Sequence, residues 1–236
     1  MNSQSLSQVL ALISVWAIPG IVAITLHEAA HGYVAWKLGD DTAYRMGRVS
    51  FNPLRHIDPF GTILLPLMLL LSGTRFMFGW AKPVPVNFGR LNHPRRDMVL
   101  VAAAGPGTNL GLALISALLV HVAALFPDVA QDWALHNLVH SIEFNVILAV
   151  FNMFPLPPLD GGRVAVGLLP RELARPLAKL ERWGLFILIG LLFILPSVFH
   201  IHVFSWLVGV PADFLIRMVC SVTGLGSACQ SIAGLW

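Results

Sequence analysis

The chain has 236 residues, of which 56% are hydrophobic and 11% charged, and its formal net charge is +3. An ordinary soluble domain carries about 25% charged residues because its surface must face water, so this composition excludes one. Several stretches are long and apolar enough to cross about 30 Å of hydrocarbon, which indicates that lipid surrounds much of the chain. The basic residues lie beside these stretches rather than along one polar face, so we expect no nucleic-acid partner. The two cysteines, Cys220 and Cys229, are not spaced as metal ligands and leave open only a single disulfide between them.

The first apolar stretch, residues 8–36, is expected to be a membrane span that Pro19 and Gly20 interrupt. The N-terminus before it lacks the basic start and the cleavage site of a secretory signal, so we expect this span to be retained. Residues 60–71 form a second apolar stretch that is short for a full crossing, and the sequence favours a re-entrant hairpin there. The stretch 79–96 is rich in Pro and Gly and alternates in AKPVPVN, which predicts an extended segment rather than a helix.

Three more stretches are expected to be clear membrane spans, and a fourth is a candidate. The clear spans are residues 98–126, 138–156 and 183–199, and the candidate is 203–222. Together these elements predict an all-α polytopic membrane protein of about five to six membrane segments, with the short extended or re-entrant region between the first and second clear spans. No connection is long enough for a separate soluble domain, so the whole chain is expected to form a single transmembrane domain, with its core at about residues 8–200.

The distribution of basic residues predicts the orientation of the spans. Of fifteen Lys and Arg residues, four lie in 37–58, five in 73–96 and five in 161–182, whereas the opposite ends of the clear spans contain none. Short cytoplasmic loops carry such an excess of Lys and Arg. We therefore expect a multi-pass protein of a plasma or inner membrane, with its N-terminus outside and its basic loops in the cytoplasm.

The first span contains the run HEAAH at residues 27–31. Four residues apart on a helix, His27 and His31 project from one face with their rings close enough to bind one metal ion. Glu28 lies beside the first histidine, where a carboxylate can take a proton from a zinc-activated water and deliver it to a leaving amine. Five-residue patterns of this kind also occur by chance, but ionisable groups inside an apolar span are costly and rarely lack a function. The run therefore predicts a zinc-dependent hydrolase centre.

A catalytic zinc ion has three protein ligands and one open position, so a third ligand is expected from another apolar span. Asp160 in FNMFPLPPLDGGR is the candidate, because the third span and the HEAAH span both end on the predicted cytoplasmic side. The prolines of this run exclude a regular helix, and Gly161 and Gly162 allow the chain to turn sharply. The alternative is that Asp160 only caps a helix starting near Gly161.

These two motifs resemble those of the site-2 proteases, a family of intramembrane zinc metalloproteases. HExxH is present as HEAAH, and the family's Asn-x-x-Pro and Leu-Asp-Gly pattern is present as Asn152, Pro155, Leu159, Asp160 and Gly161. The resemblance implies one zinc ion per chain, held by His27, His31 and Asp160, with Glu28 as the general base. It also implies that Asn152 holds the substrate backbone or the oxyanion. The active site would then lie near the cytoplasmic side.

The resemblance covers about residues 21–163 and includes two further elements. AGPGTN in the second clear span, with Gly105, Pro106 and Asn109, is similar to a Gly-Pro-x-x-Asn element of the family. Close helix packing alone can explain such small residues, and Asn109 can also donate a hydrogen bond near the site, to a substrate for example. The stretch GWAKPVPVN resembles the family's membrane-associated strand region, where an edge would pair with an unwound substrate segment.

Other polar residues are expected to lie outside the site. His136 and His140 are four residues apart, but no carboxylate follows His136 and both lie near the outer end of their span. His56 and Asp58 border the cytoplasmic side near the first span. They either shape the site and its access or have no part in it.

The sequence predicts an intramembrane zinc endopeptidase that cuts a peptide bond in or beside a transmembrane helix of another membrane protein, in regulated intramembrane proteolysis. The expected partners are that substrate and the lipid bilayer, and no pattern specifies an oligomeric state. The connection between the second and third spans has no room for a PDZ-like domain, so substrate selection must come from the core, the loops or partners. Two alternatives remain open: a membrane zinc hydrolase of a non-protein substrate, and a non-catalytic zinc-binding or transport protein.

Overall fold

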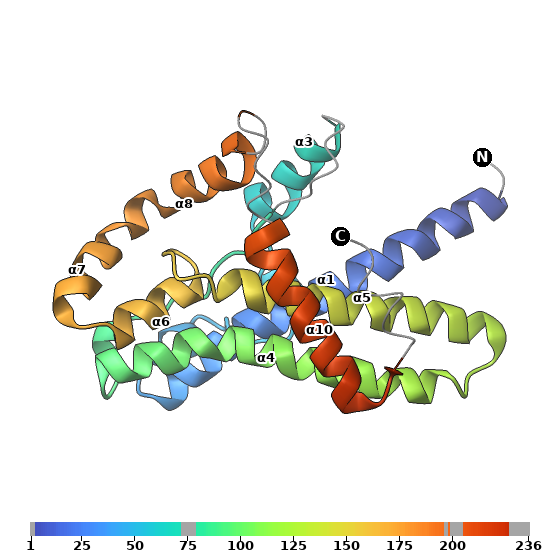
Figure 1. Ribbon diagram of the computed structural model, residues 1–236, viewed down its shortest axis with the longest axis horizontal. Coiled ribbons are helices and arrows are strands. Elements are labelled where there is room, and N and C mark those ends of the chain that lie inside the picture. Colours follow the sequence, from blue (N-terminus) through green and yellow to red (C-terminus); the bar gives the residue numbers. More distant parts are fainter. Residues whose placement is uncertain (1–2, 72–78, 196–197, 199–204, 227–236) are drawn as a thin grey trace.

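A computed structural model describes residues 3–71, 79–195, 198 and 205–226 (Figure 1). Within these residues the regular elements are all helices, and no strand occurs. In chain order they are α1 (Ser3–Lys37), α2 (Thr42–Arg45), η1 (Pro53–Arg55), η2 (Pro59–Leu64), α3 (Leu65–Leu71), η3 (Phe88–Arg90), α4 (Pro94–Ala123), α5 (Asp128–Asn152), α6 (Asp160–Leu168), α7 (Arg171–Lys179), α8 (Glu181–Ile189), η4 (Gly190–Ile194), η5 (Ser205–Gly209) and α10 (Val210–Thr223). The predicted all-α class is confirmed.

Four helical stretches of the described chain are long and apolar enough to cross a membrane. They are Ile13–Lys37 in α1, Pro94–Ala123 in α4, Ala130–Asn152 in α5, and Ser205–Thr223 in η5 and α10. The first three match clear spans of the sequence analysis, and the last matches the candidate span 203–222. The span predicted at 183–199 lies partly outside the described residues, and its described part forms α8 and η4. The protein is thus an all-α membrane protein.

Two details predicted for the spans are wrong. The sequence predicts an interruption at Pro19, but α1 continues through it, because neighbouring helices and local adjustments compensate the freed backbone groups of a membrane helix. The helix of the third clear span begins earlier than predicted, at Asp128. Its first turns carry polar residues, so an apolar pattern does not reveal them. The helix ends at Asn152 rather than at residue 156, because the run that begins at Pro155 cannot continue a helix.

The bundle is organised around α4, which contacts α1, α5, α6 and α10 (Figure 1). α1 and α5 run in one direction, and α4, which contacts both, runs in the opposite direction. A core between α4, α5 and α10 comprises Ala113, Ala117, Ile142, Val146, Ala212, Ile216, Val219, Cys220 and Leu225. The alanines of α4 in this core let α5 and α10 approach closely, as small residues do in membrane bundles. Cys229, which a disulfide with Cys220 would need, lies outside the described residues.

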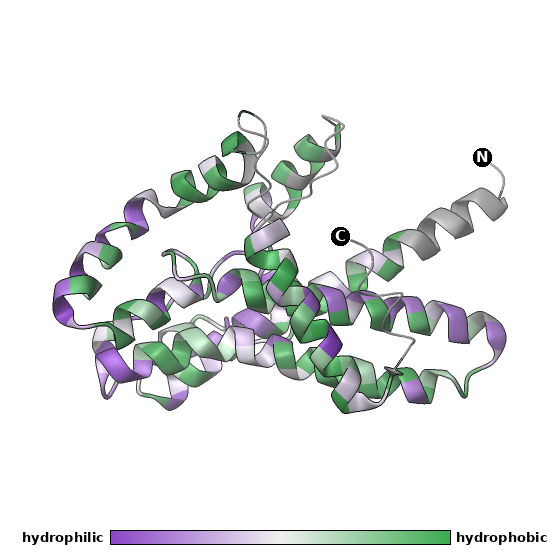
Figure 2. Ribbon diagram, in the orientation of Figure 1, coloured by the Kyte–Doolittle hydropathy of each residue, from purple (hydrophilic) through white to green (hydrophobic). Residues whose placement is uncertain are grey.

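Hydrophobic residues run through the helices of the bundle (Figure 2). Large side chains such as Leu118, Trp206 and Phe214 are exposed on the spans. Polar residues are frequent where α4 begins, where α6 passes into α7, and in the first turns of α5. This arrangement suits a surface whose middle faces lipid and whose ends face water.

The described residues on the two sides of 72–78 meet near the start of α3. Trp80 donates its N–H to the carbonyl of Gly61 at 3.1 Å, and its own carbonyl accepts from the Thr62 hydroxyl at 2.8 Å. The chain that departs after Thr62 is therefore back at the same level at Trp80. A re-entrant hairpin and a pair of crossing segments both require such a return, so the re-entrant form of residues 60–71, which lie in η2 and α3, stays a prediction.

Residues 81–87, called the extended segment below, are neither helix nor strand, as the sequence predicts. The N–H of Asn87 donates to Oδ2 of Asp40 at 2.6 Å, which holds the segment against the end of α1. Burial alone would raise the pKa of Asp40, but the hydrogen bonds from Thr42 and Asn87 outweigh it and hold the pKa below its ordinary value. Asp40 is thus an ionised anchor for the segment.

Glycines pack α6 and α8 against the proline-rich run that joins α5 to α6. The sequence predicts a sharp turn at Gly161 and Gly162, but both lie inside α6 and neither has a positive φ. Close packing explains them instead, since a Cβ on Gly162 would lie 2.2 Å from the backbone nitrogen of Pro157. A Cβ on Gly184 of α8 would lie 1.9 Å from the Pro157 carbonyl oxygen.

We expect Gly184→Ala to lower the midpoint of thermal unfolding, because the added methyl group forces α8 away from Pro157. Overpacking of this kind costs about 1–3 kcal/mol. Circular dichroism of the purified protein in detergent measures the midpoint. Gly190→Ala is the matched control, because a Cβ there meets no atom within 4 Å. Equal midpoints for Gly184→Ala and this control would contradict the packing described.

Candidate metal centre

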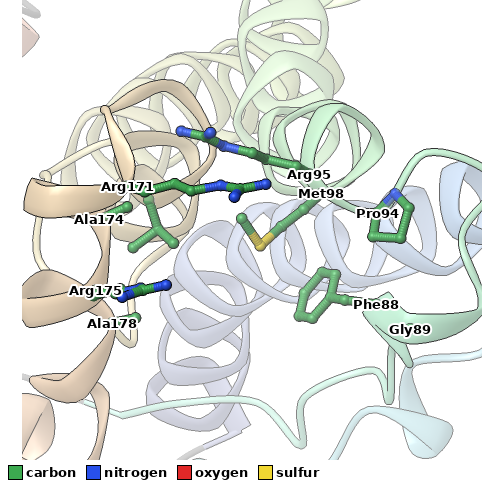
Figure 3. Close-up of a pocket in the computed structure, with 10 residues that line it drawn as sticks. Phe88, Gly89, Pro94, Arg95, Met98, Arg171, Ala174, Arg175 and Ala178 are labelled. Atoms are coloured by element: carbon green, nitrogen blue, oxygen red, sulfur yellow. The ribbon is translucent and has the colours of Figure 1, made fainter.

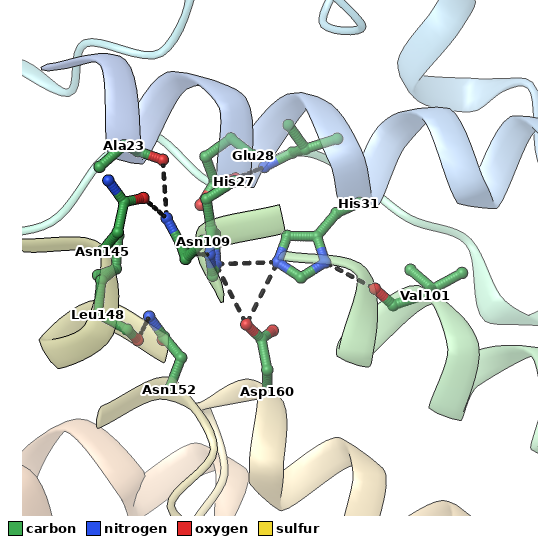
Figure 4. Close-up of polar contacts among 11 residues, drawn as sticks. Ala23, His27, Glu28, His31, Val101, Asn109, Asn145, Leu148, Asn152 and Asp160 are labelled. Carbon is green, nitrogen blue, oxygen red and sulfur yellow. Dashed lines mark hydrogen bonds and ion pairs between the residues drawn. The ribbon is translucent and has the colours of Figure 1, made fainter. Parts of the chain in front are cut away.

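Two histidine rings of α1 meet inside the bundle (Figure 4). His27 and His31 lie one helical turn apart, and their Nε2 atoms are 3.0 Å from each other. Only 5% of His27 and 8% of His31 is exposed. The spacing of four residues places both rings on one helix face, as the sequence predicts.

The third side chain of the centre is Asp160, the first residue of α6. Its Oδ2 lies 3.2 Å from Nε2 of His27 and 3.2 Å from Nε2 of His31. One potential ligand atom from each of the three residues lies within 4.8 Å of the others. α6 begins at Asp160 itself and its N-cap is Leu159, so Asp160 is not the cap of a helix that starts near Gly161. The fold unites motifs that lie 129 residues apart, from His31 to Asp160.

The donor set fits a zinc ion. Two imidazole nitrogens and one carboxylate oxygen are ligand types of catalytic zinc sites. Oδ2 of Asp160 is buried and lacks a hydrogen bond of good geometry, although both ring nitrogens are near it. Among the described residues, no other group of three His, Cys, Asp or Glu side chains is placed in this way.

Helix α4 leaves space for the centre through a glycine. A Cβ on Gly105 would lie 2.4 Å from Nε2 of His31 and 2.6 Å from Cε1 of His27. Any side chain at this position would therefore occupy the space beside the ligand atoms. The glycine of AGPGTN thus lies directly against the centre, which is a more specific role than general helix packing.

Both imidazoles are held at Nδ1 by acceptors on α4. Nδ1 of His27 lies 2.6 Å from Oδ1 of Asn109, and Nδ1 of His31 lies 2.7 Å from the Val101 carbonyl oxygen. Because both partners are acceptors, each Nδ1 carries the proton and donates it. Each Nε2 is then left with its lone pair directed at the centre, which is the tautomer that a metal ligand needs.

Asn145 of α5 supports this arrangement, and the sequence analysis misses it. Asn109 donates through Nδ2 to Oδ1 of Asn145 at 2.8 Å and to the Ala23 carbonyl at 3.2 Å. These two bonds fix the Asn109 amide with its oxygen toward His27. Asn145 in turn donates to the Ser141 carbonyl at 2.8 Å. The signal that could have revealed Asn145 is a polar amide inside an apolar span, which needs a partner there.

Glu28 is half-buried and contacts the extended segment. Its Oε2 accepts the N–H of Val84 at 2.8 Å. Since Glu28 follows the ligand His27 directly, this bond keeps the carboxylate between α1 and the extended segment. The backbone of His56 holds the same segment, because its carbonyl accepts from the Lys82 N–H at 2.9 Å.

Asn152 ends α5, and its described partner lies within that helix. Its Nδ2 donates to the Leu148 carbonyl at 3.0 Å, and Figure 4 shows the amide turned toward that carbonyl. No described hydrogen bond joins Asn152 to the two histidines or to Asp160. A role for Asn152 with substrate therefore remains a prediction, as does a substrate contact for Asn109.

A second buried ionisable pair lies elsewhere in α5. Nδ1 of His140 is 3.0 Å from Oε2 of Glu143, and the ring of His140 lies 4.1 Å from that of Trp16 between centroids. His136 is exposed and contacts the Asp132 carbonyl. Neither histidine belongs to the centre, in agreement with the sequence analysis. Glu143 is a further buried residue that the sequence analysis does not single out.

Three curated proteins are similar to this chain over most of its length. "Putative zinc metalloprotease YwhC" of Bacillus subtilis is 42% identical over 191 residues, which cover 79% of this chain and 83% of that protein. "Putative zinc metalloprotease Rip2" of Mycolicibacterium smegmatis is 29% identical, and the protein of that name in Mycobacterium tuberculosis is 31% identical; each match covers 75% of this chain and 66% of the relative. This chain belongs to the site-2 protease family. No family model and no solved structure matches it.

For this member of the site-2 protease family we expect Gly105→Ala to weaken zinc binding by at least about 100-fold, because the methyl group displaces the two imidazoles. Competition with a chromogenic chelator on detergent-purified protein measures the affinity. Gly107→Ala lies on the same helix and meets no atom within 4 Å, so it should bind zinc like the unaltered protein. Tight binding by both variants would refute the close approach of α4 to the ligands.

We expect Asn109→Ala to weaken zinc binding by about 10- to 100-fold, as loss of a hydrogen-bonded partner of a histidine ligand typically does. The same chelator competition measures the loss. Ser116→Ala is the control, because Ser116 is also buried in α4 but contacts the Ser141 hydroxyl rather than a ligand. If both variants bound zinc equally well, Asn109 would have no role in orienting His27.

Proposed function

We propose that this protein is an intramembrane zinc endopeptidase, which hydrolyses a peptide bond in or near a transmembrane segment of another membrane protein. The observation that carries the proposal is the meeting of His27, His31 and Asp160 inside a bundle of membrane-spanning helices. The names of the relatives, each of which begins with "Putative zinc metalloprotease", support the same chemistry. The activity would serve regulated intramembrane proteolysis.

The centre would hold one zinc ion per chain on His27, His31 and Asp160. A bound zinc ion supplies Lewis-acid activation of a water molecule and of the substrate carbonyl. The chain's own contribution is the fixed orientation of its donors, because Asn109 and Val101 hold the two imidazoles from α4. The buried position of all three donors strengthens their electrostatic effect on a reacting carbonyl.

Glu28 is the proposed general base. Its carboxylate follows the first ligand and is kept in place by the Val84 N–H, so it can accept a proton from water without a large movement. The same carboxyl group can then deliver that proton to the amine that leaves. Asn152 and Asn109 are the proposed contacts for the substrate backbone or for the developing oxyanion.

The extended segment is the proposed docking edge for substrate. Within the described chain, the N–H of Val86 and the carbonyl of Val84 make no hydrogen bond, whereas the N–H of Val84 binds Glu28. An unwound substrate strand could pair with these free groups by strand addition. Such pairing would place its backbone next to Glu28 and the ligands.

The proposed orientation places the N-terminus outside and the centre near the cytoplasmic side of a plasma or inner membrane. The C-terminal end of α1, the start of α4 and the α6–α7 connection lie toward one end of the bundle (Figure 1). These are the parts of the described chain that carry most of its Lys and Arg residues. The positive-inside rule assigns such an end to the cytoplasm.

We expect Glu28→Gln to lower the rate of peptide cleavage by about 100- to 10,000-fold, because glutamine cannot accept the proton. Glutamine retains an oxygen that can accept the Val84 N–H, so zinc stoichiometry and thermal stability should stay unchanged. Peptides that contain single transmembrane helices are incubated with the protein in vesicles. Mass spectrometry then detects cleavage within the helix as a complementary pair of N-terminal and C-terminal fragments. Glu181→Gln, which changes a carboxylate paired with Arg163 on the surface, is the control.

Full cleavage by the Glu28→Gln variant would exclude hydrolysis through this base. Release of single terminal residues, or turnover of lipid esters in place of peptides, would identify a different zinc hydrolase. Zinc binding without any hydrolysis, in a panel of membrane-helix peptides, would identify a binding or transport role.

A further inference from the structure

A pocket lies apart from the metal centre, where α4 begins and α7 passes beside it (Figure 3). Its volume is about 390 Å³. It is lined by Phe88, Gly89, Pro94, Arg95, Met98, Val166, Arg171, Ala174, Arg175 and Ala178. Three of these residues are arginines and none is acidic, so the pocket is cationic.

The arginines of α7 lack the partners that would neutralise them. Arg171 and Arg175 lie one turn apart and extend from α7 toward α4 in Figure 3. No hydrogen bond or ion pair of either guanidinium group occurs within the described chain. Like charges at this spacing destabilise a helix unless an anion compensates them. Glu172 is the carboxylate nearest in sequence, and it does not line the pocket.

Arg95 adds a third positive charge in a fixed position. It donates to the Gly167 carbonyl at 2.9 Å and to the Leu169 carbonyl, which ties the first turn of α4 to the end of α6. The first turn of α4 also contains Asp97, whose carboxylate accepts the His93 N–H at 2.8 Å and does not line the pocket. Arg95 is therefore the one of the three cationic groups that the described chain holds in place.

The rest of the pocket is apolar. Met98, Val166 and Phe88 form its wall, and Ala174 lies buried on the face of α7 that contacts it. α7 carries Arg171, Arg175 and Lys179 at intervals of four residues, as in a helix that lies in a membrane interface. A pocket with guanidinium groups beside an apolar wall suits an amphiphile rather than a free anion.

We propose that this pocket binds an anionic phospholipid, with the phosphate between Arg171, Arg175 and Arg95 and the acyl chains along Met98 and Val166. The pocket is lined by residues at the start of the membrane span of α4, where a span meets lipid headgroups. Basic pockets between helices at this depth recognise anionic headgroups. An acidic flank of a substrate would find the same charges, but it would leave the apolar wall without a partner.

The test is a binding measurement on the complete purified protein. Native mass spectrometry counts bound lipid after titration with short-chain phosphatidylglycerol, with phosphatidylcholine of the same chain length, with inorganic phosphate and with an acidic peptide. We expect one phosphatidylglycerol per chain, and weaker binding of the other three probes by about ten-fold or more. Arg171→Gln combined with Arg175→Gln should weaken phosphatidylglycerol binding by about 30-fold.

Lys179→Gln combined with Arg182→Gln is the matched control, because it removes two positive charges close by from residues that do not line the pocket. It should change the affinity less than about two-fold. Equal losses in both double variants would overturn the proposal in favour of a diffuse surface charge. Preference for phosphate or for the acidic peptide would overturn it as well. Zinc stoichiometry of each variant verifies that the fold is intact, and the measurement does not depend on protease activity.

Discussion

The meeting of Asp160 with His27 and His31 is the interaction on which the rest of the structure depends. A carboxylate and two imidazoles are buried within helices that otherwise face lipid or each other. Such groups cost several kcal/mol each in an apolar interior unless they find partners or a metal ion. Their shared contact offsets this cost, and it requires the start of α6 to lie against the C-terminal half of α1. The proline-rich run before α6 permits this, because it ends α5 early and leaves Asp160 free to turn inward.

Helix α4 orients the two histidines as metal ligands and leaves space beside them. It supplies the Val101 carbonyl and the Asn109 amide that hold the imidazoles, and it supplies the bare backbone at Gly105 beside them. The three positions lie four residues apart, so they share one face of the helix. Asn145 extends the support into α5 and fixes the direction of the Asn109 amide. The helices of the bundle are thus joined through polar groups near the centre and through small apolar residues in the core between α4, α5 and α10.

The extended segment and the cationic pocket are linked to the metal centre through different helices. The segment is anchored by Asp40 and by Glu28, so it lies against α1 and next to the proposed base. The pocket is connected to the centre through α6, whose nine residues span about 12 Å. Asp160 begins that helix, and Arg95 holds the carbonyls at its end. A lipid that stabilises this end would therefore stabilise the helix that carries the third ligand.

Much of this protein follows from its sequence alone. The length of the apolar stretches determined the class and most of the spans, because a fixed hydrocarbon thickness leaves little freedom. The histidine spacing determined one half of the centre, since a helix repeats every 3.6 residues regardless of its surroundings. Asp160 was recognisable because a catalytic zinc ion needs a third ligand, and this carboxylate follows an apolar span that ends on the same side of the membrane as the HEAAH span.

Only the tertiary structure decided which residues of different helices meet, because a local sequence pattern holds no information on such contacts. Asn145 and Val101 could not be assigned to the centre, because their roles depend on which helix faces come together. The role of Gly105 could not be assigned from the sequence either, because a glycine is expected both where two helices pack closely and where a helix approaches metal ligands. Gly161 and Gly162 were predicted to turn the chain, but they allow close packing against the proline-rich run instead, and α1 continues past Pro19. Contacts between helices decide such matters, and the sequence determined which groups needed partners while the fold alone decided which partners they met.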